Sequence, residues 1–146
     1  MPNWTTNFLS FEAPKQKIID LKKLFATKER VFDFNKILPM PEHSDTFYAE
    51  GSLGEEEREK FGENNWYHWS SKNWGTKWNA VDSNLDIDKE NKILYAFRTA
   101  WDAPRGVMRE IVNKRDTYIA GCSHIKWSCF HEGEEEEEII LMFIPK

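Results

Sequence analysis

"ILYAFRTAWDAPRGVMREIV", residues 93–112, changes periodicity halfway along and so indicates the class of fold. The apolar side chains at positions 93, 95 and 97 face one way, which is typical of a strand with one buried face. Pro104 then favours the first position of a helix, and Val107 and Ile111 recur at helical spacing. A strand followed closely by an amphipathic helix predicts an α+β protein.

The same two periodicities, followed outward, predict the other elements. Helices are expected at residues 15–27, 65–73 and 104–114, with Gly75 closing the second of them in the left-handed conformation. Residues 31–41 are apolar but end in two prolines, so they are expected to be extended or an edge segment. Residues 43–63 are expected to form a surface loop with one helical turn. Strands are expected at residues 4–11, 76–81, 93–99, 117–120, 125–130 and 139–144, the last two as a hairpin.

These elements fit one domain covering residues 1–146. Without an insertion at residues 42–75, their order is βαββαβ, the ferredoxin-like split arrangement with an antiparallel sheet. The insertion contributes an aromatic helix, and a C-terminal β-hairpin follows the split arrangement. The helices expected at residues 15–27 and 104–114 have apolar stripes of similar width. They are therefore expected on the same face of the sheet.

The overall charge narrows the classes of partner. A formal net charge of −5 argues against direct binding to a nucleic-acid backbone, which requires a positive surface. The longest apolar run, at residues 139–145, is too short to span a bilayer, and no signal peptide is visible at the start. Two cysteines cannot form a disulfide framework, so we expect a cytoplasmic protein.

The segment "NNWYHWSSKNWGTKWNA", residues 64–80, contains four of the seven tryptophans. Aromatic planes interleaved with amide and cationic side chains suit a nucleotide-like ligand, whereas tryptophans at helical spacing often only form core. By strand periodicity, Trp78 is expected to face the core, with Lys77 and Asn79 on the opposite side. The candidate ligand-binding residues are Trp66, His68, Trp69, Asn73, Trp74, Thr76, Lys77 and Asn79.

Other motifs do not predict a metal or a catalytic site. Cys122, His124, Cys129 and His131 are all zinc-capable, but along one strand the first pair and the second pair face opposite ways, so no zinc site is expected. Residues 82–88 lack the glycine and the terminal acid of a calcium loop and are expected to form a turn. No nucleophile–base pattern is evident. The acidic runs at 55–57 and 134–138 are expected to be solvated loops.

Four stretches resemble the phage- and plasmid-borne YubB family: "MPNW" at residue 1, "FNKILPMP" at residue 34, "WYHWSSKNWGTKWNA" at residue 66 and "FRTAWDAP" at residue 97. The resemblance implies a ferredoxin-like fold and a mobile-element origin, and it supplies no catalytic residues or cofactor. Thr5, where the family often has cysteine, and Asp102-Ala103, where Ser-Pro is usual, depart from the family pattern.

Two functional hypotheses follow from these observations. The first is a phage or mobile-element accessory protein that acts without catalysis by binding, with a host or phage protein as partner. The alternative is a protein that sequesters or processes a small nucleotide-like molecule at the aromatic corner, residues 66–79. Solvent exposure of the tryptophans separates the ligand hypothesis from a purely structural cluster.

Overall fold

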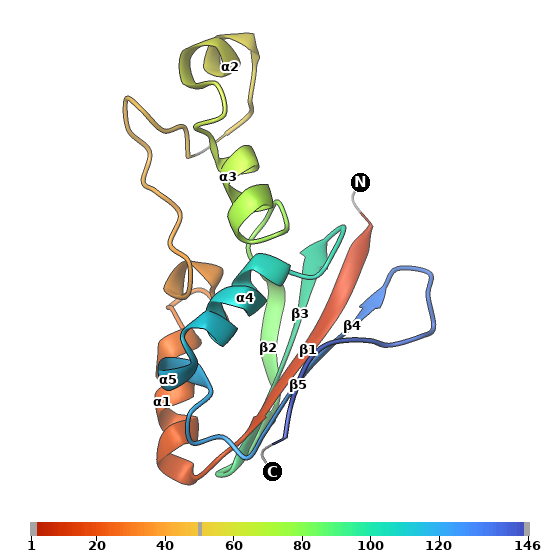
Figure 1. Cartoon of the computed structure of the whole chain (residues 1–146). Coiled ribbons are helices and arrows are strands. Elements are labelled where there is room, and N and C mark those ends of the chain that lie inside the picture. Colours follow the sequence, from red (N-terminus) through yellow and green to blue (C-terminus); the bar gives the residue numbers. More distant parts are fainter. Residues whose placement is uncertain (1–2, 50, 145–146) are drawn as a thin grey trace.

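The computed structural model describes residues 3–49 and 51–144. It is an α+β structure built on one five-stranded antiparallel sheet with the strand order β2-β3-β1-β4-β5 (Figure 1). The strands are β1 (Trp4–Glu12), β2 (Val81–Asp88), β3 (Lys92–Ala100), β4 (His124–His131) and β5 (Glu138–Phe143). The helices are α1 (Lys15–Phe25), α2 (Glu55–Phe61), α3 (Trp66–Asn73), α4 (Arg105–Asn113) and α5 (Arg115–Tyr118), with a short 3-10 turn, η1, at Phe34–Lys36.

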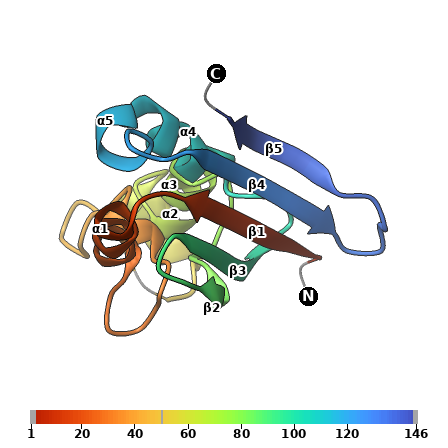
Figure 2. The same ribbon diagram turned by 90° about the horizontal axis from the view of Figure 1, so that it is seen from below.

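Helices α1 and α4 cover the same face of the sheet, as predicted (Figures 1 and 2). Phe25 of α1 and Ile111 of α4 belong to one core cluster with Tyr95 and Trp127 of the strands. The ring of Phe25 lies edge-on to that of Tyr95, with centroids 5.6 Å apart. A shared sheet face buries the apolar stripes of both helices at once, which explains why the two lie on the same side.

Four local predictions from the sequence are wrong. Residues 76–80 are irregular, and the strand begins only at Val81 and continues through the segment expected to be a turn. Residues 117–120 form the end of α5 and a turn, because Tyr118 packs flat on Phe25 at 5.5 Å between ring centroids and fills the space below α4. The segment expected to be extended contains η1, with Phe32 and Phe34 completely buried in the core.

Helices α2 and α3 form an arm that projects from one end of the sheet (Figure 1). The arm corresponds to the predicted insertion, and α2 is longer than the single turn expected there. No residue of α2 is buried, whereas α3 lies against the start of α4. Among the aromatic side chains of α3, Tyr67 is 43% exposed, whereas Trp69 packs against the core cluster.

Candidate functional site

Two residues, one at each end of α3, define the helix that leads into the corner between α3 and β2. The side chain of Asn65 accepts a hydrogen bond from the backbone N–H of His68 at 2.9 Å and so caps the start of α3. Gly75 has a φ of +87°, which confirms the left-handed position predicted at the end of this helix. The aromatic segment is therefore a capped helix that leads into a tight corner.

Two of the candidate ligand residues instead fasten this corner to the body of the protein. The indole Nε1 of Trp74 donates to the carbonyl oxygen of Leu38 at 2.9 Å, and its ring is 2% exposed. The hydroxyl of buried Thr76 donates to the carbonyl oxygen of Ala100 at 2.7 Å. Both polar groups are satisfied by backbone, so Trp74 and Thr76 are structural.

The expected arrangement of Lys77, Trp78 and Asn79 is wrong. Trp78 is 36% exposed, and its ring lies 6.1 Å from that of Trp4. The ammonium of Lys77 lies over the Trp78 ring, 4.2 Å from its centroid. Asn79 points inward, where Oδ1 accepts from the backbone N–H of Phe34 at 3.0 Å. Since residues 76–80 are not a strand, the alternation that assigned these orientations does not apply.

Asn79 also donates from Nδ2 to Asp33 at 2.8 Å, and this contact supports a pH-dependent prediction. Burial alone would raise the pKa of Asp33, but hydrogen bonds from Asn79, Asn35 and Thr27 and the charge of Arg30 lower it below its ordinary value. Asp33→Asn should therefore reduce the free energy of unfolding at neutral pH by about 1–3 kcal/mol.

The loss should disappear in acid. A folded-state pKa below the unfolded value means that the stabilisation is complete above the unfolded pKa, about 3.9, and is lost as the pH falls through the folded value. Urea unfolding of wild type and Asp33→Asn, at neutral pH and at about pH 3, measures the difference. An equal loss at both pH values would contradict this role for the carboxylate.

Three other candidate residues line a hollow on the arm. His68, Trp69 and Asn73 lie around a cavity of about 400 Å³. The remaining lining residues are Pro41, Phe47, Glu63, Asn64 and Lys72. Trp66 lies outside this cavity and borders a separate hollow of about 310 Å³ that shares only His68 with it. The structure thus divides the predicted ligand site and gathers three of its eight residues in one place.

The walls of the arm cavity are held in position by contacts behind them. Trp69 packs edge-on against buried Trp74, with ring centroids 5.4 Å apart and planes at 87°. Asn73 donates its Nδ2 to the carbonyl oxygen of Trp69 at 2.9 Å, which directs its Oδ1 away from that bond. Nδ1 of His68 contacts the side chain of Asn65, so its Nε2 is the ring nitrogen left for a ligand. The cavity therefore combines the aromatic side chain of Trp69 with polar atoms of Asn73 and His68 that can donate or accept a hydrogen bond.

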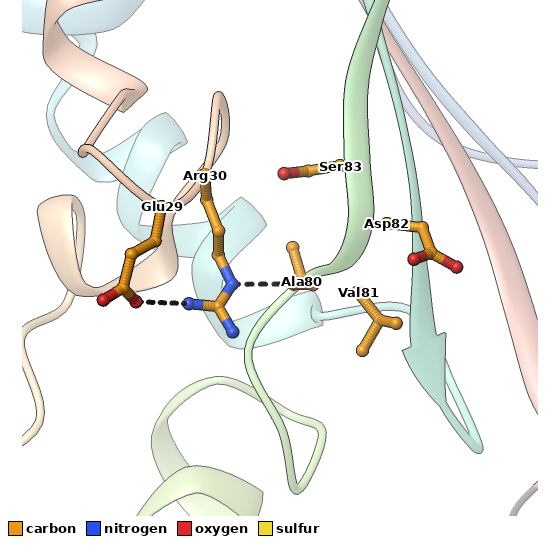
Figure 3. Close-up of a pocket in the computed structure, with 6 residues that line it drawn as sticks. All are labelled: Glu29, Arg30, Ala80, Val81, Asp82 and Ser83. Atoms are coloured by element: carbon orange, nitrogen blue, oxygen red, sulfur yellow. Dashed lines mark hydrogen bonds and ion pairs between the residues drawn. The ribbon is translucent and has the colours of Figure 1, made fainter.

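A third hollow, of about 370 Å³, lies beside the start of β2 (Figure 3). Arg30 crosses it, donating from Nε to the carbonyl oxygen of Ala80 at 2.9 Å and pairing with Glu29 at 3.6 Å. The guanidinium is therefore already engaged by the protein and is not free for a ligand. Its contacts across this hollow hold residues 76–80 to the loop after α1.

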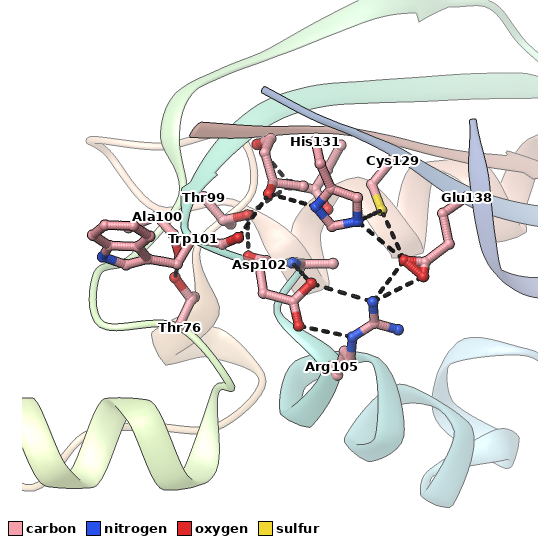
Figure 4. A network of polar contacts seen from close by, with 12 residues as sticks. Thr76, Thr99, Ala100, Trp101, Asp102, Arg105, Cys129, His131 and Glu138 are labelled. Carbon is pink, nitrogen blue, oxygen red and sulfur yellow. Dashed lines mark hydrogen bonds and ion pairs between the residues drawn. The ribbon is translucent and has the colours of Figure 1, made fainter. Parts of the chain in front are cut away.

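A polar cluster at the edge of β4 is the main feature that the sequence did not reveal (Figure 4). Cys129 pairs with Glu138 across strands β4 and β5. Nε2 of His131 lies 3.1 Å from Oε1 of Glu138 and 3.8 Å from the sulfur of Cys129. Arg105 of α4 donates to both oxygens of Glu138, at 2.7 and 2.9 Å, and to Asp102. The glutamate run at residues 134–138 was expected to be solvated, so nothing in the sequence indicated that Glu138 faces inward.

The charges of this polar cluster alter the protonation of its members. Hydrogen bonds from His131 and Arg105 hold the pKa of Glu138 below its ordinary value. Burial, aided by the negative charge of Glu138, raises the pKa of Cys129 to about 11. The Cys129 side chain is completely buried, so in the protein alone it is a protonated thiol rather than an accessible nucleophile.

The four zinc-capable residues identified in the sequence do not gather at one point. Cys122 Sγ donates to the carbonyl oxygen of Tyr118, and His124 lies beside Glu12 at the opposite end of β1 from the polar cluster. Only Cys129 and His131 share a site. The strand-parity reasoning assumed one continuous strand, but β4 begins at His124 and leaves Cys122 outside it. It also took no account of a carboxylate from the neighbouring strand.

The backbone next to the polar cluster is strained. Trp101 has a φ of +71°, an uncommon conformation for a bulky residue, and its side chain is 57% exposed. Its backbone is fixed by hydrogen bonds, since its N–H donates to the carbonyl oxygen of Asn3 and its carbonyl oxygen accepts from the hydroxyl of Thr5. Strain held in this way is more common at functional sites than elsewhere.

Comparison of the chain with protein-family models, curated proteins and solved structures found no match. Among the described residues, no helix has the length and apolar character needed to cross a membrane.

Proposed function

We propose that this protein is a non-catalytic accessory protein of a phage or related mobile element, and that it acts by binding. The resemblance of four sequence stretches to the YubB family supports the mobile-element origin. The element order β1-α1-β2-β3-α4-β4 and the strand order β2-β3-β1-β4 support a ferredoxin-like assignment, with β5 added beyond β4.

The arm cavity is the observation that carries the binding role. Its volume of about 400 Å³ lies within the range of small-molecule sites. Trp69, Asn73 and His68 line it together, and Lys72 contributes a positive charge beside the negative charge of Glu63. A planar heteroaromatic ligand with a polar edge and an anionic group, such as a nucleotide, matches this combination.

The buried thiol supports binding rather than catalysis. Cys129 lies beside a histidine and a carboxylate in the polar cluster, and burial keeps it protonated. Nucleophilic catalysis requires an activated and accessible group. The arm cavity itself contains no cysteine, serine or threonine among its lining residues.

Titration calorimetry with AMP, GMP, CMP and UMP tests the proposed function. Trp69→Leu should weaken binding by about tenfold or more, because the stacking plane is lost. Lys72→Ala should weaken binding of the nucleotides more than binding of the corresponding nucleosides, since only the nucleotides carry phosphate. Lys23→Ala, an exposed lysine of α1, is the matched control and should bind like wild type.

Quenching of tryptophan fluorescence should follow the same binding curve. Failure of all four nucleotides to bind the folded wild type would reject the nucleotide assignment. Binding that is unchanged in both Trp69→Leu and Lys72→Ala would move the site away from the arm.

A host protein, the partner expected first from the sequence, is supported separately by the outer edge of β5. Ile139 and Met142 are about half exposed on this edge strand, at 50% and 46%. Exposed apolar side chains on an unpaired edge favour pairing with a strand of another protein. In cross-linking with host proteins, Ile139→Lys should abolish a specific adduct that Trp69→Leu retains; loss in both variants, or in neither, would reject this edge as the interface.

A further inference from the structure

The polar cluster at β4 and β5 has the composition and spacing of a metal site. Its three inward donors are the sulfur of Cys129, Nε2 of His131 and a carboxylate oxygen of Glu138, all within 4.8 Å of one another. The separations are 3.8 Å from sulfur to nitrogen, 3.1 Å from nitrogen to oxygen and 4.0 Å from sulfur to oxygen. Tetrahedral zinc, with bonds of about 2.0–2.3 Å, places its ligand atoms about 3.3–3.6 Å apart. The cluster therefore needs only shifts of a few tenths of an ångström.

Thr5 can orient His131 so that its Nε2 is available to a cation. The Thr5 hydroxyl donates to the carbonyl oxygen of Trp101 at 3.3 Å and lies 3.2 Å from Nδ1 of His131, where its oxygen can accept from an Nδ1–H. In that tautomer the lone pair of Nε2 faces Oε1 of Glu138 at 3.1 Å, and a cation can bind between them.

A cation bound between Nε2 of His131 and Oε1 of Glu138 is attracted by both atoms. The buried sulfur of Cys129 adjoins the same point, and a softer third donor favours zinc over calcium or magnesium. A histidine whose other nitrogen is anchored by a hydrogen bond is also the usual arrangement in metal sites.

The surrounding charges suit a divalent ion. Arg105 binds the Glu138 carboxylate and is itself balanced by Asp102. With Cys129 as a thiolate, the cluster contains three negative charges and one positive charge, so a divalent cation leaves it neutral. His131 and Glu138 are each partly exposed, which gives the ion an entry path and leaves a fourth position for water.

From these contacts we infer that Cys129, His131 and Glu138 bind a zinc-type divalent cation, with Thr5 orienting His131 and Arg105 orienting Glu138. This inference replaces the sequence-based expectation that no metal binds at Cys129 and His131. It is independent of the proposed ligand cavity, which shares no residue with this site.

Cobalt titration of chelator-treated protein tests the inference, because a thiolate bound to Co²⁺ gives a charge-transfer absorption in the near ultraviolet. We expect one equivalent of Co²⁺ per chain, with this absorption, displaced by one equivalent of Zn²⁺. Cys129→Ser should lose the absorption, while Cys122→Ser, which alters the other buried cysteine, should keep it.

Glu138→Gln and Glu137→Gln form a second matched pair on adjacent residues. Glu137 pairs with Lys126 and not with the polar cluster, so its substitution should leave metal affinity unchanged. Glu138→Gln should weaken Co²⁺ binding by about tenfold or more, and Thr5→Val should weaken it through His131 by a similar factor. Circular dichroism verifies that each variant is folded, and Glu138→Gln carries the test if Cys129→Ser does not fold.

Two results would overturn the inference. One is the absence of stoichiometric Co²⁺ or Zn²⁺ binding to folded wild type, which would leave the polar cluster as a network of ion pairs and hydrogen bonds. The other is equal binding by the Glu138→Gln and Glu137→Gln proteins, which would place the metal elsewhere.

Discussion

Gly106→Ala should destabilise the protein by about 3 kcal/mol or more, because the added methyl group has no space. A Cβ on Gly106 would lie 1.8 Å from the carbonyl oxygen of Asn73 and 3.0 Å from the carbonyl carbon of Trp74. These are backbone atoms at the end of α3, and the Gly106 N–H donates to the carbonyl oxygen of Trp74 at 3.0 Å. Relief of the clash would separate α3 from α4. Urea unfolding monitored by circular dichroism measures the loss.

Two other glycines separate this steric effect from backbone strain. Gly133 has a φ of +82° but no atom within 4 Å of an added Cβ, so Gly133→Ala should cost only about 1 kcal/mol. Gly75 combines a φ of +87° with a contact at 3.0 Å to the backbone nitrogen of Arg105, and Gly75→Ala should cost more than Gly133→Ala. A Gly106→Ala protein as stable as the Gly133→Ala protein would show that the α3–α4 seam is not closely packed.

Trp127→Ala should cost about 3–5 kcal/mol, the range for truncating a large aromatic side chain in a core. Trp127 is completely buried on β4, edge-on to Phe32 and Phe97, and its Nε1 donates to the side chain of Asn7 at 3.2 Å. Truncation removes these contacts and leaves the buried Asn7 oxygen without its donor. The free energy of urea unfolding, compared with that of wild type, measures this cost.

Trp78→Ala is the matched control. The sequence pattern placed Trp78 in the core, but the ring is partly exposed and contacts Trp4 and Lys77. Its loss should therefore cost about 1 kcal/mol or less. Similar losses for Trp78→Ala and Trp127→Ala would contradict the burial on which both expectations depend.

The elements that the sequence predicted correctly are those whose pattern is set by burial alone. Strand β3 and helix α4 each bury one face against the same core, so their apolar periods match their structures. The segment at 76–80 has a strand-like alternation for another reason. The hydroxyls of Thr76 and Ser70 and the amide of Asn79 each bond to backbone groups, and these bonds hold the segment in an irregular path.

Composition misled the prediction for β2. Asp82, Ser83 and Asn84 are turn-forming residues, but this segment is an edge strand with register shifts against β3. Asp82 has a positive φ, which an aspartate tolerates better than most residues, and pairs with Arg98 of β3. Edge strands with charges and irregular pairing are common because they resist association with other sheets.

The two candidate sites differ in how far local sequence patterns could predict them. His68, Trp69 and Asn73 share one helix, so their common cavity followed from helical spacing. Cys129 and Glu138 meet because of the register between β4 and β5, which shifts between Trp127 and Ser128. A one-residue change in register reverses which glutamate faces inward, so the run of five could not identify Glu138.

The central position of β1 has a consequence for how the chain folds during synthesis. β1 is the first strand made, yet both of its neighbours come late, and Thr5 contacts His131 across a separation of 126 residues. A ribosome must therefore synthesise β4 before one side of β1 has a partner. Pairing across such separations closes long loops and slows folding. Until then one edge of β1 has unpaired backbone N–H and C=O groups, so chains stalled before residue 124 should be the ones that aggregate or require a chaperone.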